Sequence, residues 1–366
     1  MIPSYQTIDW HRFLARPPLP APPPDTVSFL VRHPILITGA GGSIGSALAF
    51  RLGSAGARTI LLESSESSLH DLQQDFANTD IADSATFYLG SVANRFLLDE
   101  IFSLHDPRFV FHAAAFKHVP LIEEQPLAAI ANNLFATEIL IAAACNHNTR
   151  VILLSTDKAV APASMMGATK RVAEQIVLTA GGTVLRLGNV LASRGSVTEV
   201  FARQISGHLP LTVTDPAARR YFLTISEAVD LLLAAAEAQT PALFAPQLAA
   251  PHFIADLARF MARTLAPQNK TSIEFTHLRA GDKESEQLWS PNERPHPSNA
   301  GGLVSIDSPS IPRGQLDSLL ATLRHAVETR DLSAALAVLR TLVPEYKPSS
   351  TVLSRLSTVT AQVSHE

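Results

Sequence analysis

The sequence predicts an α/β protein with a doubly wound parallel sheet and a smaller C-terminal α/β region. Short, unbroken apolar runs alternate with helix patterns from residue 34 to about residue 190, as expected for strands buried on both faces. A glycine-rich turn follows the first run, and polar residues follow the run 151–154. Open α/β sheets bind ligands at the carboxyl ends of such strands.

Composition narrows the class of protein. The chain has 366 residues, of which 46% are apolar and 17% charged, which indicates a globular protein. A net charge of −4 argues against a nucleic-acid partner. Cys145 is the only cysteine, so no intramolecular disulfide can form. We expect a cytoplasmic protein without a membrane span, because no apolar run approaches the ~20 residues that a span needs.

Residues 1–30 are predicted to form a proline-rich arm. The six prolines from Pro17 to Pro24 favour an extended polyproline conformation. Trp10, Phe13 and Leu14 precede them. These apolar residues predict that the first part of the arm packs, either on the globular body or on a neighbouring subunit.

A nucleotide site is predicted after the first strand. The run 34–38 leads into the glycine-rich turn Gly39–Gly45 and then a helix pattern. Glycines let the backbone approach a pyrophosphate, whose charge lies on the helix N-terminus. The next strand, 59–62, ends in Glu63, where a carboxylate binds the adenosine ribose diol. No arginine is close by, which favours NAD over NADP. We therefore predict a Rossmann domain that binds NAD over residues 31–185.

The alternation continues with strands over 86–89 and 109–112. Ala113–Ala115 follow, and such small residues let a nucleotide lie against the backbone. A helix expected over 126–145 carries the amides of Asn132–Asn133 within an alanine-rich apolar face. Buried amides need partners, so a purely structural bridge is one interpretation of this pair.

The stretch from Ser155 to Lys170 carries the predicted chemistry. A helix that begins near Ser164 places Met166 and Lys170 on one face. This layout resembles a short-chain dehydrogenase site, whose usual Tyr-x-x-x-Lys puts a base and a cofactor-binding lysine on one helix. Met166 stands at the tyrosine position and cannot move a proton. Either the site is inactive, or Asp157 and Lys158 do the acid–base work.

Arginines recur on polar loops of the C-terminal half, at Arg194, Arg219–Arg220 and Arg279. Each one taken singly fits a solvated surface, but their recurrence favours a diphosphate, which guanidinium groups bind bidentately. The 13 histidines show no metal-ligand spacing.

The domain organisation follows from these segments. We expect a substrate-binding region over 193–350, interleaved with returns of the Rossmann domain near 186–192 and 220–260. Residues 351–366 then form a tail.

Several segments together resemble the nucleotide-sugar 4,6-dehydratases of the CapD-like polysaccharide-biosynthesis group, within the extended short-chain dehydrogenase/reductases. The matching segments are Thr38–Gly45, Phe111–Pro120, Ser155–Lys170, Arg186–Ser196, Arg220–Thr224 and Leu278–Lys283. Members with methionine at the tyrosine position resemble UDP-N-acetylglucosamine dehydratases that retain configuration at C5. Met166 is therefore within the pattern of the family.

The resemblance implies a reaction on UDP-N-acetylglucosamine for surface polysaccharide or glycan biosynthesis. C4 is oxidised, water is eliminated across C5 and C6, and hydride returns to C6. In the terms of the family, Lys158 is the base at C5, Asp157 the acid toward the C6 hydroxyl, and Thr156 a hydrogen-bond donor near the C4 oxygen. Met166 replaces the tyrosine, and Lys170 binds the nicotinamide ribose.

Binding residues also carry over by position. The cofactor set is Gly39, Gly42, Ser43, Ile44, Gly45, Glu63, Ser91, Val92, Ala113, Ala114, Ala115, Asn133, Ser155 and Lys170. The substrate set is Lys117, Asn189, Arg194, Ser196, Arg220, Arg279 and Asp282. Five residues depart from the family: Ser91 stands for an aspartate, Asp282 for a glutamate, Ala136 for a glycine, Phe116 for a tyrosine and Arg219 for a small polar residue. Short-chain dehydrogenases associate through helices, so we expect a homo-oligomer.

Two conditions accompany the assigned pair. Asp157 and Lys158 can both face the sugar only if the strand ends before them, because adjacent strand residues point to opposite faces. Lys158 must also be neutral to act as a base. We expect burial and the cations of Lys117 and Lys170 to lower its pKa toward neutrality.

Two alternative functions stay open. A nucleotide-sugar 4-epimerase has the same fold, but it needs a C4 base, normally the missing tyrosine, and has no use for an elimination pair. A catalytically silent nucleotide-sugar-binding protein fits Met166, but the intact Thr156-Asp157-Lys158 argues against it.

Overall fold

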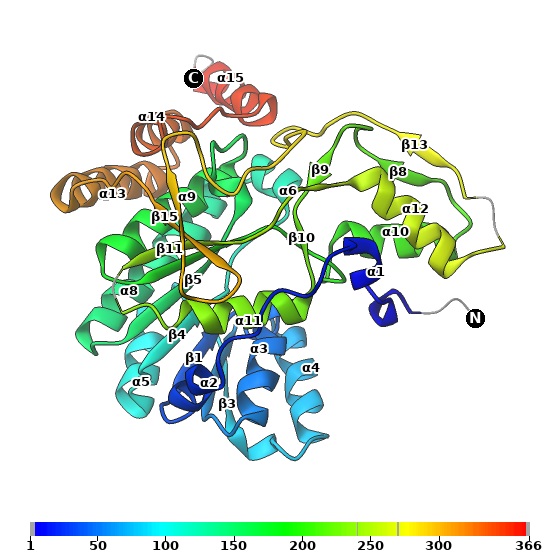
Figure 1. The fold of residues 1–366 in the computed structure, drawn as a ribbon. Coiled ribbons are helices and arrows are strands. Elements are labelled where there is room, and N and C mark those ends of the chain that lie inside the picture. Colours follow the sequence, from blue (N-terminus) through cyan, green and yellow to red (C-terminus); the bar gives the residue numbers. More distant parts are fainter. Residues whose placement is uncertain (1–3, 240, 269–270, 364–366) are drawn as a thin grey trace.

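The computed structural model describes residues 4–239, 241–268 and 271–363, with side chains to residue 356. Its centre is a nine-stranded sheet with helices on both faces, as Figure 1 shows. The strands lie in the order β14-β15-β11-β6-β5-β4-β1-β2-β3. All pairings from β11 to β3 are parallel, and β15 and β14 add an antiparallel edge. The expected doubly wound α/β fold is confirmed.

Strands β1 to β6 lie close to where the apolar runs predict them, and β11, β14 and β15 are further strands of the same sheet. Their bounds are β1 (Ile35–Thr38), β2 (Thr59–Glu63), β3 (Ala85–Leu89), β4 (Phe109–His112), β5 (Arg150–Thr156), β6 (Thr183–Leu187), β11 (Ala242–Pro246), β14 (Arg294–Pro297) and β15 (Leu303–Asp307). The chain reverses its direction of travel across the sheet between β1 and β4, which creates the crevice where doubly wound folds bind ligands.

The apolar run that ends the alternation near residue 190 forms two short strands. The apolar run over 183–190 forms β6 and then β7 (Asn189–Val190), which pairs with β10 (Phe222–Leu223) outside the main sheet. Gly188 separates the two pieces, and a Cβ at this position would lie 2.5 Å from the carbonyl oxygen of Tyr221. The absence of a side chain lets the two segments approach, and this carries Asn189 out of the sheet.

Helices cover the two faces with separate apolar cores. One face packs α5 (Arg95–His105), α8 (Ala136–Asn146), α9 (Met165–Thr179), α13 (Arg313–Glu328) and α14 (Leu332–Leu342). The other packs α2 (Pro24–Leu30), α3 (Ser43–Ser54), α4 (Glu66–Ala77) and α11 (Ile225–Ala235). The final helix, α15 (Ser350–Val363), contacts α6 (Val119–Glu124).

The helix expected over 126–145 is not uniform. It begins as α7 (Pro126–Ala129), widens into a π-helical turn over Ile130–Phe135, and continues as α8. The whole run, Pro126–Asn146, has 21 residues and a mean hydropathy of 1.6, so by length and composition alone it could cross a membrane. The expectation that no apolar run approaches this length is therefore wrong. About 61% of its most apolar part is buried in the fold, as in a core helix.

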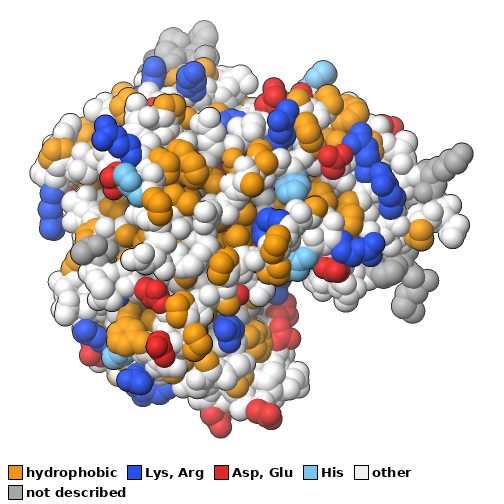
Figure 2. Space-filling model, in the orientation of Figure 1, with side chains coloured by type: hydrophobic (Ala, Val, Ile, Leu, Met, Phe, Trp, Pro, Cys, Tyr) orange, Lys and Arg blue, Asp and Glu red, His pale blue; other side chains and the backbone are white. Residues whose placement is uncertain are grey.

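A smaller region is built from segments that leave the sheet and return to it. It holds α10 (Val197–Ser206), α12 (Ile254–Leu265), the pair β8 (Leu211–Val213) and β13 (Ile273–Phe275), and the pair β9 (Arg219–Arg220) and β12 (His252–Phe253). These elements share an apolar core of their own. Figure 2 shows this region as a lobe on the right, with an indentation below it.

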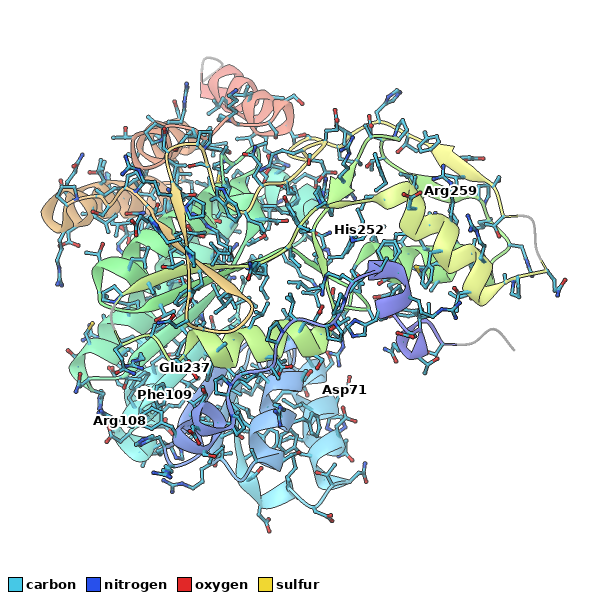
Figure 3. The ribbon with its side chains drawn as sticks, viewed as in Figure 1. Asp71, Arg108, Phe109, Glu237, His252 and Arg259 are labelled. Atoms are coloured by element: carbon cyan, nitrogen blue, oxygen red, sulfur yellow. The ribbon has the colours of Figure 1, made fainter. Side chains whose placement is uncertain are left out.

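The N-terminal arm packs on this lobe of its own chain. Trp10 and Phe13 are buried there, and the Phe13 ring centroid lies 5.1 Å from that of His252, which is labelled in Figure 3. Arg16 donates two hydrogen bonds to the carboxylate of Glu227. Of the two positions open from the sequence, the structure shows the globular body. The prolines end at Pro24, which begins α2.

A buried ion cluster joins the sheet to the C-terminal half. Arg186 on β6 has no exposed surface, and its guanidinium contacts Glu174 at 2.7 Å and Glu293 at 2.8 Å. Burial opposes the charge of Glu293, but hydrogen bonds from Arg186 lower the pKa of this carboxyl to about 2. The pKa of Glu174 is also lowered, chiefly by Arg186 against burial.

We expect Arg186→Met to destabilise the fold by about 3–5 kcal/mol, because two buried carboxylates are then left to share the one positive charge of Arg171. Urea unfolding measures the change. The matched control is Arg95→Met, since Arg95 pairs with Asp99 at 3.6 Å on the surface and should lose under about 1 kcal/mol. The folded-state pKa of Glu293, about 2, lies below its usual 4.5. Its contribution is therefore complete above pH 4.5 and is lost as the pH falls toward 2. Equal losses in both variants would contradict this account.

Candidate active site

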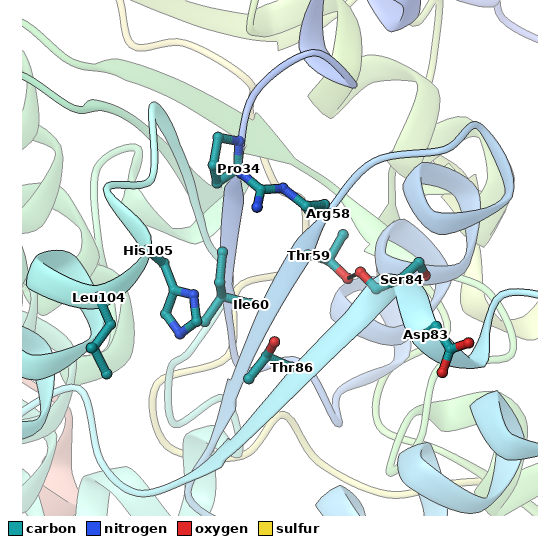
Figure 4. A pocket seen from close by; sticks show the side chains of 9 residues that line it. All are labelled: Pro34, Arg58, Thr59, Ile60, Asp83, Ser84, Thr86, Leu104 and His105. Carbon is teal, nitrogen blue, oxygen red and sulfur yellow. Dashed lines mark hydrogen bonds between the residues drawn. The ribbon is translucent and has the colours of Figure 1, made fainter.

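A large cleft of about 1240 Å³ lies between the carboxyl ends of the parallel strands and the smaller lobe. A second pocket, of about 160 Å³, lies at the amino ends of the strands, beside Pro34, Thr59 and His105 (Figure 4). It is too small for a dinucleotide and lies away from the glycine turn. The large cleft is therefore the candidate site.

The glycine turn forms one end of the cleft. Gly39 adopts a φ of +67°, and a Cβ there would lie 2.7 Å from the amide nitrogen of Ala114. A Cβ at Gly45 would lie 2.2 Å from the carbonyl oxygen of Gly39. Helix α3 begins at Ser43, so its free N–H groups face the cleft. This turn has the form of a pyrophosphate cradle.

Glu63 lies beside the turn, at the end of β2. Its carboxylate accepts hydrogen bonds from the backbone N–H groups of Gly41, Ser64 and Ser65 at 2.8–3.0 Å. Among the described residues, no arginine or lysine forms an ion pair with it. This oriented carboxylate suits a ribose diol and is unfavourable to a 2′-phosphate.

Most of the expected cofactor residues line the cleft together: Gly39, Gly42, Ser43, Ile44, Gly45, Glu63, Ser91, Val92, Ala113, Ala114, Ala115, Ser155 and Lys170. Asn133 does not. It is buried in the π-helical turn, where its side chain accepts from the Phe116 N–H and donates to the Phe116 carbonyl. It is the structural bridge that the sequence left as an alternative, and it holds the loop after β4.

The strand before Asp157 and Lys158 ends ahead of them, as it must if both side chains are to face the cleft. β5 ends at Thr156, and a single 3-10 turn, Asp157–Ala159, follows. Lys158 lines the cleft, but Asp157 is fully buried and does not. Asp157 Oδ1 accepts from Thr156 Oγ1 and from Lys158 Nζ, both at 3.0 Å. Asp157 therefore connects to the cleft through these two side chains.

The charge of Lys158 differs from expectation. Burial lowers its pKa, but the carboxylates of Asp157 and Glu286 outweigh burial, so the pKa is raised. Arg220 is the cation that opposes them, and neither Lys117 nor Lys170 takes part. The expected shift toward neutrality is therefore wrong for the protein without ligands. Burial raises the pKa of Asp157, against the effect of Lys158.

Helix α9 presents its first turns to the cleft. Its N-cap is Ser164, whose hydroxyl accepts from the Gly167 N–H at 3.2 Å. Met166 and Lys170 both line the cleft. Burial lowers the pKa of Lys170 to about 8, with Glu174 opposing. The helix therefore presents to the cleft a lysine with a pKa of about 8. At the tyrosine position it presents a methionine, which has no hydroxyl.

All the expected substrate residues line the cleft as well: Lys117, Asn189, Arg194, Ser196, Arg220, Arg279 and Asp282. They fall into separate groups of contacts, and in one of these groups Lys117 Nζ donates to the Arg194 carbonyl. The Arg194 N–H donates to Ser43 Oγ at 2.9 Å, and its guanidinium donates to the Gly41 carbonyl at 3.0 Å. Arg194 therefore lies across the glycine turn, at the end suited to the cofactor.

The other two arginines of the substrate set have partners of their own. Arg220 is buried and donates to the backbone carbonyls of Arg219 and Glu284. Arg279 is exposed and pairs with Asp282 at 3.0 Å.

Sequence reasoning missed the buried acids around this site: Glu123, Glu174, Glu286 and Glu293. No spacing pattern links them to their partners, because most of the contacts join segments far apart in the chain. Within the described residues, no group of three or more His, Cys, Asp or Glu side chains could hold a metal ion.

Comparisons with known proteins agree with this geometry. A family model described as "Polysaccharide biosynthesis protein" matches residues 35–307. The probable polysaccharide biosynthesis protein EpsC of Bacillus subtilis is 39% identical over 71% of this chain and 45% of its own length. The capsular polysaccharide biosynthesis protein CapD of Staphylococcus aureus is 37% identical over 80% of this chain and 50% of its own. The chain thus spans about half the length of these two relatives.

A UDP-glucose 4-epimerase of Rickettsia rickettsii is 36% identical over 71% of this chain and 78% of its own length. Among solved structures, Pen from Bacillus thuringiensis has a TM-score of 0.69 at 24% identity, covering 80% of this chain and 98% of its own. The Thermus thermophilus UDP-glucose 4-epimerase in complex with NAD has a TM-score of 0.62 at 19% identity, over 70% and 90%. The chain therefore belongs to the polysaccharide biosynthesis protein family and has the extended short-chain dehydrogenase/reductase fold.

Proposed function

We propose that this protein is an NAD-dependent nucleotide-sugar 4,6-dehydratase, a hydro-lyase that acts on UDP-N-acetylglucosamine for surface polysaccharide or glycan biosynthesis. The observation that carries the proposal is the position of Lys158. It lines the cleft beside a helix that has Met166 where a tyrosine base is usual. Its Nζ donates hydrogen bonds to Asp157 Oδ1 at 3.0 Å and to Asn189 Oδ1 at 3.1 Å. An elimination needs a base that is separate from the C4 chemistry.

The residues present fit NAD. The turn has room for a pyrophosphate because its glycines carry no side chains, and the Glu63 carboxylate lines the cleft beside it. The family relationship supports the same cofactor. When bound, NAD would supply the chemistry of a hydride acceptor at C4 of the sugar and of a hydride donor at C6.

The side chains of the chain itself supply the proton transfers. Once C4 is a ketone, the C5 proton becomes acidic, and neutral Lys158 removes it. Asp157 has an oxygen, Oδ2, without a hydrogen-bond partner in the described structure, and burial raises its pKa. It can hold a proton and pass it through Thr156 to the departing C6 oxygen.

Arg220 and Arg279 would bind the diphosphate.

A 4-epimerase is the second candidate, because relatives of that name match most of their own length. It would need a group that moves the proton of the C4 hydroxyl. Lys170 lines the cleft and has a suitable pKa, about 8, so it would be the group for that role. In this second function Lys158 would have no proton to remove from C5.

The product separates the candidates. Incubated with NAD and UDP-N-acetylglucosamine, the purified protein should give a product lighter by one water, as measured by mass spectrometry. A product of unchanged mass with inverted C4, resolved by chromatography, would establish the epimerase instead. Binding without any product would establish the silent protein.

Lys158→Met should reduce kcat by about 10²–10⁴-fold, because it removes the general base. NAD content after purification, read from absorbance, should stay at the wild-type level, since Lys158 is not in the cofactor set. Lys347→Met is the matched control, because this lysine is exposed and outside the cleft. Wild-type activity in the Lys158 variant would remove it from the base role.

A further inference from the structure

Glu286 is a buried carboxylate behind the cleft that the proposed reaction does not use. It is 3% exposed and does not line the cleft. Its Oε1 lies 3.7 Å from Lys158 Nζ and 4.0 Å from Arg220 Nε, and its Oε2 lies 2.7 Å from Lys283 Nζ. A buried carboxylate is stable as an ion only when it is paired. Burial opposes its charge, but Lys158 and Lys283 outweigh burial and lower the pKa of Glu286.

Glu286 also helps to fix the turn that carries Lys158. Lys283, its ion-pair partner, donates a hydrogen bond to the Val160 carbonyl at 2.9 Å, directly after the turn Asp157–Ala159. Lys158 Nζ is thus surrounded by three oxygens, from Asp157, Asn189 and Glu286. Of the two carboxylates, Asp157 is the sequence neighbour, and Glu286 comes from a distant segment.

We propose that Glu286 is a positioning residue that orients Lys158 and sets its strength as a base, without touching the substrate. The inference rests on the proposed role of Lys158. In the elimination, the C5–H bond breaks and its proton bonds to the Lys158 amine. The C–H electron pair forms the C5–C6 double bond, and the C6–O bond breaks with its electrons on oxygen. The oxygen takes the proton of Asp157 and leaves as water.

An anion 3.7 Å from the amine stabilises the ammonium that this step forms. A more basic amine removes the C5 proton more readily, at the cost of needing a higher pH to become neutral. Glu286 is therefore expected to raise both the maximal rate and the pH at which that rate is reached. The charged and titratable groups that face Lys158 or its partners are Asp157, Arg220, Tyr221, Lys283 and Glu286.

The test compares Glu286→Gln with the wild-type holoenzyme. Competitive acetylation with acetic anhydride across pH, read for Lys158 by mass spectrometry, gives the pKa of this amine without any turnover. We expect it to fall by about one pH unit or more in the variant, as for removal of a neighbouring opposite charge. The rising limb of the pH–kcat profile should move to lower pH by the same amount. Its plateau should fall about tenfold, with little change in KM.

Two further variants keep the result interpretable. Lys283→Met removes a cation from the same cluster, so it should move the pKa of Lys158 upward. Glu286→Asp keeps the charge and should restore most of the wild-type pKa. An unchanged pKa of Lys158 in a folded Glu286→Gln protein would overturn the inference, and so would shifts of the same sign in the Gln and Met variants. If the acetylation shift appears but no water is lost from the sugar, the electrostatic role of Glu286 holds and the dehydratase proposal fails.

Discussion

The ion cluster around Arg186 is the interaction on which the rest of the site depends. Its guanidinium, on β6, binds Glu174 of α9 and Glu293 of the segment that returns as β14. Ser155, at the end of β5, donates to the same Glu174 at 2.6 Å. One buried arginine thus fixes the spacing between two strand ends and the helix that carries Met166 and Lys170. Without it, the two buried carboxylates would share the single positive charge of Arg171, and one buried negative charge would be left uncompensated, which is costly.

The same cluster explains why Lys158 and Lys170, two of the lysines that line the cleft, have pKa values shifted in opposite directions. Glu174 lies one helical turn from Lys170, but it is committed to Arg186, so burial dominates and the pKa of Lys170 falls to about 8. Lys158 has Asp157 and Glu286 near it, and its pKa is raised. Two lysines in one cleft therefore differ in charge because of which buried acids are free to face them. Titratable groups whose pKa values are shifted in opposite directions are typical of sites that move protons.

The sequence predicts the parts of this arrangement that depend on local pattern. Apolar runs, and the turn residues that end them, act over a few residues. They predict strands β1 to β6, the glycine turn and Glu63. Glu286 could not be found in this way, because its partner Lys158 lies 128 positions earlier and no period connects them. The acidic side chain of Asp157 predicts a place in the cleft. The 3-10 turn after Thr156 decides instead where this side chain points, and buries it. Arg194 matched a substrate position, but the fold lays its loop on the glycine turn.

Burial of Asp157 bears on which reaction this cleft can support. A carboxyl that faces solvent at neutral pH is ionised and cannot give a proton, whereas a buried one with a raised pKa can hold it until an oxygen needs it. In the proposed reaction Thr156 would give this proton a route into the cleft, and Lys158 beside it would accept another. A donor and an acceptor fixed 3.0 Å apart on one turn suit a reaction in which one proton leaves carbon as another joins a neighbouring oxygen. Elimination of water across two adjacent carbons is such a reaction, whereas exchange of configuration at a single carbon uses only one of them.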